Sequence, residues 1–219
     1  MMQSEKYPSK VLQDAVEAIS SLPGIGSRSA LRLALHILRQ PQENIRHFAS
    51  AIDRLATDVQ YCSICRMVSD SGKCAICSDS TRNKGQICVV ENIRDVMSIE
   101  ATGQYHGVYH VLGGIISPIN GTGPSELTIG ALVSRLEAIA SGEGQPECGG
   151  QNGMPEIIFA LPGDVEGETT AFYIYRQIER FGCKVSTLAR GLGFGDGLEY
   201  ADSLTLGRSI TGRQPFRPQ

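Results

Sequence analysis

The sequence predicts an α/β protein in which a helical bundle, a small cysteine-rich module, a parallel sheet and a short closing helical segment follow one another. Three observations support this prediction. Apolar residues recur at helical spacing over the first 60 residues, four of the seven cysteines fall between positions 62 and 77, and short apolar runs alternate with helical patterns from residue 86 onward. We therefore expect four regions, over residues 1–60, 61–83, 84–189 and 190–219.

Composition places the chain among globular proteins. Its 219 residues are 41% hydrophobic and carry a net charge of -3, which leaves enough apolar material for a sizeable core. The opening residues MMQSEKYPSK contain no apolar signal segment, and no run approaches the roughly eighteen apolar residues of a membrane span. We expect a cytoplasmic protein with no membrane insertion. In that compartment, paired cysteines are more often metal ligands or redox groups than disulfides.

Three amphipathic helices are predicted in the first region. Apolar stripes run over residues 11–19, 31–38 and 45–59. The first two are separated by SLPGIGSRSA, where Pro23 ends one helix and Ser27 is a candidate N-cap for the next. The third helix is interpreted as scaffold that leads to the first cysteine pair.

The glycines of this turn allow a phosphate to come close. Gly24 and Gly26 leave main-chain amides accessible, the helix N-terminus that follows adds partial positive charge, and Arg28 and Arg32 supply full charges. The alternative is a tight helix-helix turn in which the glycines serve only backbone geometry. The first interpretation makes these four residues a candidate DNA-binding site.

Cys62, Cys65, Cys74 and Cys77 form two C-x-x-C pairs with eight residues between them. Thiolates at this spacing can occupy the corners of a tetrahedron at roughly 2.3 Å from zinc, which closes the site and makes it structural. The segment has too few apolar residues to fold alone, so metal binding would supply the missing free energy. We expect one structural zinc ion per chain; the alternative is four free or redox-active thiols.

Charge is unevenly distributed along the chain. Residues 1–85 contain eleven Lys or Arg against eight Asp or Glu, and residues 86–219 contain nine against fifteen. The weakly basic first part is compatible with nucleic acid without being a strongly basic footprint. Modest affinity per subunit favours several subunits acting together.

Four strands and four helices are predicted beyond residue 85. The strands are QICVVE (86–91), GVYHVLGG (107–114), EIIFALPG (156–163) and CKVSTLAR (183–190), and the helices cover 92–100, 125–140, 167–181 and 198–211. Strands and helices in alternation predict a parallel sheet with right-handed crossovers.

Carboxylates gather where two of these strands end. Glu91 closes the first strand, and Asp164, Glu166 and Glu168 follow the third. Ligands of parallel sheets bind at this edge, and clustered carboxylates suit magnesium. The alternative is that Glu166 and Glu168 only favour the N-terminus of a helix that begins near Gly167.

Two glycine-rich stretches and three further cysteines have simpler interpretations. Residues 141–155 form a surface excursion between helix and strand, and GLGFGDG at 191–197 lacks the Lys-Ser/Thr of a phosphate-binding loop and is interpreted as a hinge. Cys88 and Cys183 are expected in the core, and Cys148 is expected to be an exposed loop thiol.

The order of these motifs resembles the RecR family of recombination mediators across nearly the whole chain. The resemblance rests on LPGIGSRSA, the YCSIC and KCAIC pair, ICVVE, DVEGETTAFYI and the closing LARGLGFGDGLEYADSLTLGRSITGR. It implies a helix-hairpin-helix bundle, a four-cysteine zinc finger and a Toprim-type sheet domain. It also implies a nucleoid-associated DNA-repair protein that forms a ring-like homotetramer or dimer and clamps single-stranded, duplex or gapped DNA. The implied partners are RecO and RecF, in the loading of RecA onto single-stranded gaps.

Two features depart from the family pattern. The glycine-rich connection before the third strand is longer than usual, and catalytic Toprim domains pair the strand-end glutamate with Asp-x-Asp, whereas Pro162 and Asp164 stand at those two positions here. The sequence therefore favours a clamp that is not an enzyme. One alternative is a small Toprim metal-dependent nuclease that uses Glu91, Asp164 and Glu166 or Glu168 with magnesium. Another is a purely structural zinc-containing adaptor.

Overall fold

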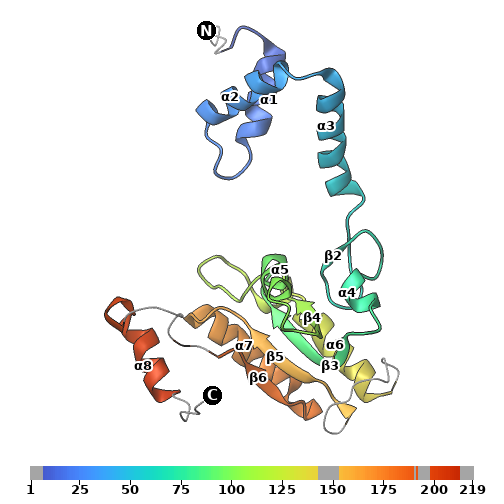
Figure 1. Cartoon of the computed structure of the whole chain (residues 1–219), viewed down its shortest axis with the longest axis vertical. Coiled ribbons are helices and arrows are strands. Elements are labelled where there is room, and N and C mark those ends of the chain that lie inside the picture. The colour runs from blue at the N-terminus through green and yellow to red at the C-terminus, as the bar shows by residue number, and fades with distance from the viewer. Residues whose placement is uncertain (1–6, 143–152, 190, 192–197, 213–219) are drawn as a thin grey trace. The chain divides into compact units, whose positions relative to one another are not determined.

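The computed structural model describes residues 7–142, 153–189, 191 and 198–212 (Figure 1). The chain divides into two compact units, Met1–Val59 and Gln60–Gln219. Most of the glycine-rich connection, with Cys148, and most of GLGFGDG lie outside the described residues, so the interpretations of both stretches stay predictions.

The first unit holds three helices, α1 (Lys10–Ser20), α2 (Ser27–Leu38) and α3 (Gln42–Thr57). They fall where the apolar stripes predict them. Helices α1 and α2 pack together around a small core of buried residues, namely Val16, Ala30 and Ala34.

The turn between α1 and α2 differs from the prediction at its helix cap. Gly24 has a φ of 81°, a left-handed conformation that favours glycine. Gly26 is extended and is itself the N-cap, and its carbonyl accepts a hydrogen bond from the amide of Ala30 at 3.0 Å. Ser27 is therefore the first helical residue, and its prediction as the N-cap is wrong.

Helix α3 buries none of its side chains in the single chain. Its apolar stripe includes Phe48, Ile52 and Leu55, each of which is more than half exposed. The periodicity correctly predicts the helix, and the interpretation of α3 as scaffold stays a prediction.

The second unit is built around a parallel sheet with the strand order β4-β3-β5-β6. Its strands are β3 (Asn83–Val90), β4 (Gly107–Val111), β5 (Glu156–Ala160) and β6 (Val185–Thr187). The predicted parallel sheet is confirmed. Because β4 and β5 lie on opposite sides of β3, the topology switches between β3 and β5, which is where α/β sheets form a binding crevice.

Four longer helices accompany the sheet. They are α5 (Ile93–Ala101), α6 (Ile129–Ala140), α7 (Val165–Ile178) and, near the end of the chain, α8 (Ser203–Thr211). Three starts differ from the prediction by two residues or more. Helix α8 begins at Ser203 rather than at residue 198, and Leu198–Tyr200 form a separate 3-10 turn before it. The residues before α6 form a separate 3-10 turn, Pro124–Glu126, because Leu127 is extended and interrupts the helix. Helix α7 begins two residues early because Asp164 caps it.

Both faces of the sheet are covered. One face carries Ile87 and Val89 of β3 and packs against side chains of α6 and α7. The opposite face carries Cys88 and Val90, and it packs against α5 and against the cysteine-rich module through the module's Met67. Burial on both faces explains why β3 reads as a continuous apolar run rather than an alternating one. The predicted core position of Cys88 is confirmed.

Strand β4 lies at one edge of the sheet, and its outward backbone groups have partners. The amide of Val111 donates to the carbonyl of Cys65 at 2.8 Å, and the Val111 carbonyl accepts from the Thr128 hydroxyl at 2.7 Å. The carbonyl of Tyr109 accepts from Nη1 of Arg135 at 2.9 Å. The cysteine-rich module and α6 together therefore complete this edge.

His110 of β4 is fully buried between α6 and the cysteine-rich module. Its Nε2 atom lies 3.0 Å from the carbonyl oxygen of Thr128. Burial, together with the charges of Arg135 on α6 and of Arg66 on the module, lowers the pKa of His110 from 6.5 to about 4. The imidazole is therefore neutral in the folded protein at mildly acidic pH.

Acidification is expected to destabilise the fold through this histidine. Between pH 7 and pH 5 the unfolded chain takes up a proton at His110 that the folded chain does not, so the free energy of unfolding should fall by about 2 kcal/mol from this group. Urea denaturation of the wild type and of His110→Gln at both pH values measures the effect, and the difference between the two proteins removes the contribution of the thiols. An equal loss of stability in both proteins would contradict the assignment to His110.

Candidate metal centre and nucleic-acid interface

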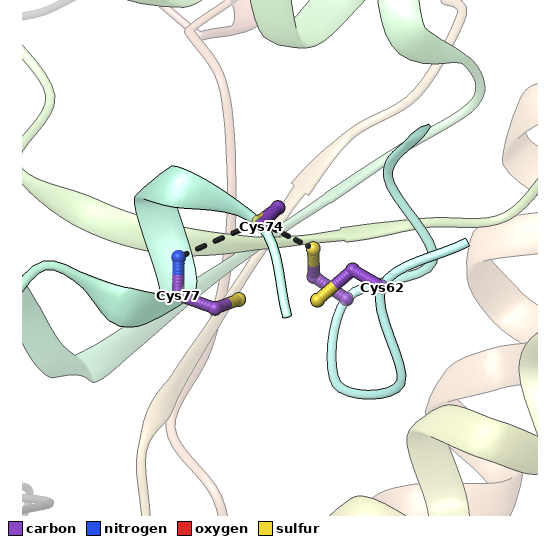
Figure 2. Close-up of side chains that lie close together, drawn as sticks. Cys62, Cys74 and Cys77 are labelled. Carbon is purple, nitrogen blue, oxygen red and sulfur yellow. Dashed lines mark hydrogen bonds between the residues drawn. The ribbon is translucent and has the colours of Figure 1, made fainter. Parts of the chain in front are cut away.

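The four paired cysteines come together in one buried cluster. Their sulfur atoms all lie within 4.8 Å of one another, and the sulfurs of Cys65 and Cys74 are 3.5 Å apart. Figure 2 shows the side chains of Cys62, Cys74 and Cys77 turned toward one another. All four are free thiols, so the cluster is not a pair of disulfides.

Short elements hold the two cysteine pairs. The first pair lies in the turn between β1 (Gln60–Tyr61) and β2 (Val68–Ser69), and the second flanks the start of α4 (Ala75–Ser78). The amide of Arg66 donates to the carbonyl of Cys62 at 3.0 Å, and the amide of Cys77 donates to the sulfur of Cys74 at 3.5 Å. These turns place the sulfurs on one side of their own backbone, as a metal-binding knuckle does.

The geometry and chemistry of this cluster fit zinc. Tetrahedral zinc with bonds of about 2.3 Å needs sulfurs about 3.8 Å apart, which is close to the spacing found here. Four buried cysteine sulfurs with no open position are the donor set of a structural site rather than a catalytic one.

The thiols do not ionise equally. Burial would raise the pKa of Cys62, but backbone hydrogen bonds with Cys65 and Cys74 outweigh it and lower this pKa to about 6. Burial raises the pKa of Cys74 to about 11, and a hydrogen bond with Cys77, together with burial, raises the pKa of Cys65 far above its ordinary value. Four adjacent thiolates therefore need a cation among them, which a divalent metal supplies.

Of the four hairpin residues predicted to meet phosphate, the two arginines share one face of α2. Arg28 and Arg32 line a groove of about 410 Å³ on α2, together with His36 and Arg39. None of the three arginines forms an ion pair within the described part of the chain. An added Cβ at Gly24 or at Gly26 would meet no atom within 4 Å, so both glycines border open space.

Sequence reasoning missed His36 and Arg39, although both are visible in the sequence. They follow Arg32 by four and seven residues, which keeps them on the same face of a helix. Extending the helical spacing beyond the first two arginines would have found them.

The predicted acidic cluster is only partly assembled. Glu91 follows β3 and Asp164 follows β5, so the two flank the topological switch of the sheet. Burial, followed by the charges of Asp95 and Asp164, raises the pKa of Glu91.

The other acidic side chains have partners of their own. An oxygen of Asp164 accepts from the amide of Gly167 at 2.8 Å, which is the helix-capping role. Glu166 accepts from the hydroxyl of Ser117 at 2.6 Å, and Glu168 forms an ion pair with Arg208 of α8 at 2.8 Å. Among the described residues, only the four cysteines form a group of three or more candidate ligands gathered around one point.

Comparison with known proteins covers most of the chain. Four family models match: the RecR helix-hairpin-helix (residues 12–56), the RecR four-cysteine zinc finger domain (59–79), the Toprim domain (85–189) and the RecR C-terminal region (191–214). The predicted combination of helix-hairpin-helix, four-cysteine zinc finger and Toprim folds is thus confirmed. In the part of the chain that the structure describes, no helix combines the length and the apolar character needed to cross a membrane.

Three curated relatives each carry the name Recombination protein RecR. They come from Porphyromonas gingivalis (50% identical), Flavobacterium johnsoniae (51%) and Bacteroides thetaiotaomicron (48%). Each alignment covers 96 to 97% of this chain and 96 to 98% of the relative. All three names are those of a recombination protein, and none is that of an enzyme.

Proposed function

The chain belongs to the RecR family of recombination proteins, and from that membership in a recombination-repair family we propose that it acts as a clamp on DNA without cleaving it. The proposal extends to the partners that the family resemblance implies, RecO and RecF, and to the loading of RecA on single-stranded or gapped DNA. It places the protein in the cytoplasm, at the nucleoid. We also propose that the chain consists of the four regions that the sequence predicts, over residues 1–60, 61–83, 84–189 and 190–219.

The basic groove on α2 is the observation that carries the proposal. Arg28, Arg32 and Arg39 place three guanidinium groups along one helix face, beside the glycine turn that opens the helix. Guanidinium groups and exposed main-chain amides both bind phosphate oxygens, and such contacts do not depend on base sequence. A groove of this composition therefore supports binding to the backbone of DNA, with Gly24 and Gly26 in the turn that precedes α2 as further phosphate contacts.

Assembly into a homo-oligomer is supported by α3. The stripe formed by Phe48, Ile52 and Leu55 is exposed in the single chain, and an amphipathic helix is stabilised when its apolar face is buried. A second copy of the chain would bury it. Joining several modestly basic grooves in a ring, as a dimer or tetramer, would raise the affinity for DNA through multivalency.

We assign the zinc finger a structural role, with one zinc ion held by Cys62, Cys65, Cys74 and Cys77. Magnesium at Glu91, Asp164, Glu166 and Glu168 belongs to the alternative function, the Toprim nuclease. Three of these four carboxylates already serve a helix cap, a hydroxyl or an arginine. The position of the first Asp of the catalytic motif is held by Pro162, whose side chain offers no ligand.

A cleavage assay separates the clamp from the nuclease. Wild-type protein is incubated with labelled single-stranded, duplex and gapped DNA in magnesium or manganese, beside the variant Asp164→Asn. Asparagine keeps the cap of α7 but loses the charge that a catalytic metal needs. We expect binding that weakens with salt and no cleavage product from either protein. Product that scales with wild-type protein and disappears in Asp164→Asn would replace the clamp with the nuclease.

A further inference from the structure

A cavity of about 670 Å³ lies between the zinc finger and the sheet domain, and the proposed clamp function does not use it. Its volume falls in the range of sites that hold a small organic ligand. Much of its wall is apolar, and its polar and aromatic lining comes from the zinc finger and from residues beside the ends of β3 and β4, namely Tyr61, Arg66, Asn92, Glu126 and Thr128. We refer to it as the knuckle cavity.

Arg66 is the unusual residue of the knuckle cavity. Among the described residues it is the only one other than glycine with a positive φ, at 64°. This left-handed conformation is unfavourable for a residue with a side chain, and glycine would adopt it readily. The chain nevertheless has an arginine here, and a strained backbone of this kind is often retained where the side chain has a function.

The guanidinium of Arg66 has no protein partner among the described residues. Its Nε atom is buried and makes no hydrogen bond, and the side chain forms no ion pair there. A buried donor without an acceptor is unfavourable, and an arginine satisfies its fork of donors best with a phosphate or a carboxylate. The knuckle cavity therefore contains a guanidinium group that is not ion-paired within the described part of the chain and that an anionic ligand would satisfy.

The other lining residues suit a ligand in which a flat ring is attached to an anionic group. Tyr61 lines the cavity and is 66% exposed, so its ring is available for stacking. The carboxylate of Glu126 can accept from an amino group, and its orientation is fixed by a hydrogen bond from the Gly123 amide at 2.8 Å. Gly130, in the first turn of α6, also lines the cavity, and the side chain of the N-cap residue Thr128 makes no hydrogen bond to the amides of that turn.

We propose that the knuckle cavity binds a nucleoside phosphate. Arg66 and the first amides of α6 hold the phosphate, Tyr61 stacks against the base, and Glu126 accepts from an amino group on the base edge. A peptide carboxylate would satisfy Arg66 but would leave the stacking surface of Tyr61 unused. A free nucleotide and one nucleotide unit of a DNA strand share this chemistry, and the inference rests on the proposed function only in the second case.

The test uses the zinc-loaded full chain and deoxycytidine 5′-monophosphate, followed by amide chemical shifts in NMR. Deoxycytidine lacks the phosphate, and inorganic phosphate lacks the base. Each should therefore bind about tenfold or more weakly than the nucleotide. The variant Arg66→Gly removes the guanidinium and suits the backbone conformation. It should weaken nucleotide binding about tenfold or more without lowering the melting temperature or the zinc content.

Arg94→Ala is the matched control, because it removes the same charge from an exposed position on α5 that does not line the cavity. It should leave nucleotide binding unchanged. Tyr61→Leu should weaken binding roughly tenfold through lost stacking. No detectable binding to the wild type, or equal losses in Arg66→Gly and Arg94→Ala, would overturn the proposal.

A single-stranded oligonucleotide distinguishes the two sources of the ligand. If Arg66→Gly weakens strand binding as well, the cavity holds a nucleotide unit of bound DNA. If only mononucleotide binding is lost, the ligand is a free nucleotide. Failure of the clamp function would appear differently, as a wild-type protein that binds no DNA at all while its nucleotide binding persists.

Discussion

Cys62→Ser and Cys74→Ser should each cost the protein its bound zinc and lower the free energy of unfolding by roughly 3 kcal/mol or more. A serine hydroxyl does not replace a thiolate in the tetrahedral site, and the zinc finger has few apolar residues with which to fold without metal. The loss should extend into the sheet domain, because Met67 and Ile76 of the zinc finger pack against the same cluster as α5. Urea denaturation gives the stability, and elemental analysis gives the zinc content.

Cys148→Ser is the matched control for these variants, since it makes the same chemical change outside the two pairs. It should leave the zinc content at about one ion per chain, as in the wild type. Wild-type protein purified without chelators that contains no zinc would refute the structural metal site.

Arg28→Ala combined with Arg32→Ala should weaken binding to single-stranded DNA about tenfold or more near physiological salt. On a single strand, each phosphate neutralised by the wild type contributes roughly 0.7 to the slope of log affinity against log salt, so the double variant should flatten that slope by about 1.4. Adding Arg39→Ala should flatten it again, because Arg39 lines the same groove. Fluorescence anisotropy over a series of salt concentrations measures both quantities.

Arg46→Ala combined with Arg54→Ala provides the comparison, because both residues are exposed on α3 and neither lines the groove. This control removes the same net charge and should change the salt slope much less. Equal flattening in the two double variants would mean that total charge, rather than the groove on α2, governs binding.

Replacing Glu91, which does not line the groove, should leave the slope of log affinity against log salt as it is in the wild type.

Local sequence patterns predicted the helices and strands well, but they predicted less well what each helix or strand packs against. The buried strands and the cysteine pairs are recognisable because burial on both faces gives continuous apolar runs and because metal ligands need fixed spacing. The amphipathic pattern of α3 predicted a helix, but periodicity does not say whether the apolar face is buried within the same chain.

Contacts between distant residues escaped prediction for a related reason. The ion pair between Glu168 and Arg208 joins residues forty positions apart, and it removes a carboxylate from the cluster that strand ends alone predict. The left-handed backbone of Arg66 depends on the path of the zinc finger, and no residue preference signals it. His36 and Arg39, by contrast, were within reach of helical spacing.

The hydrogen bond between Val111 and Cys65 covers part of a strand edge through which newly made chains could otherwise aggregate. An open strand edge is a template for pairing with other chains, and here the carbonyl of a zinc ligand occupies that edge. During synthesis the zinc finger leaves the ribosome before β4 does, so a finger that has already captured its metal is ready to cover the strand as it appears. When zinc is scarce, the zinc finger would not be ready to cover the edge of β4. Newly made chains would then become substrates for chaperones and proteases.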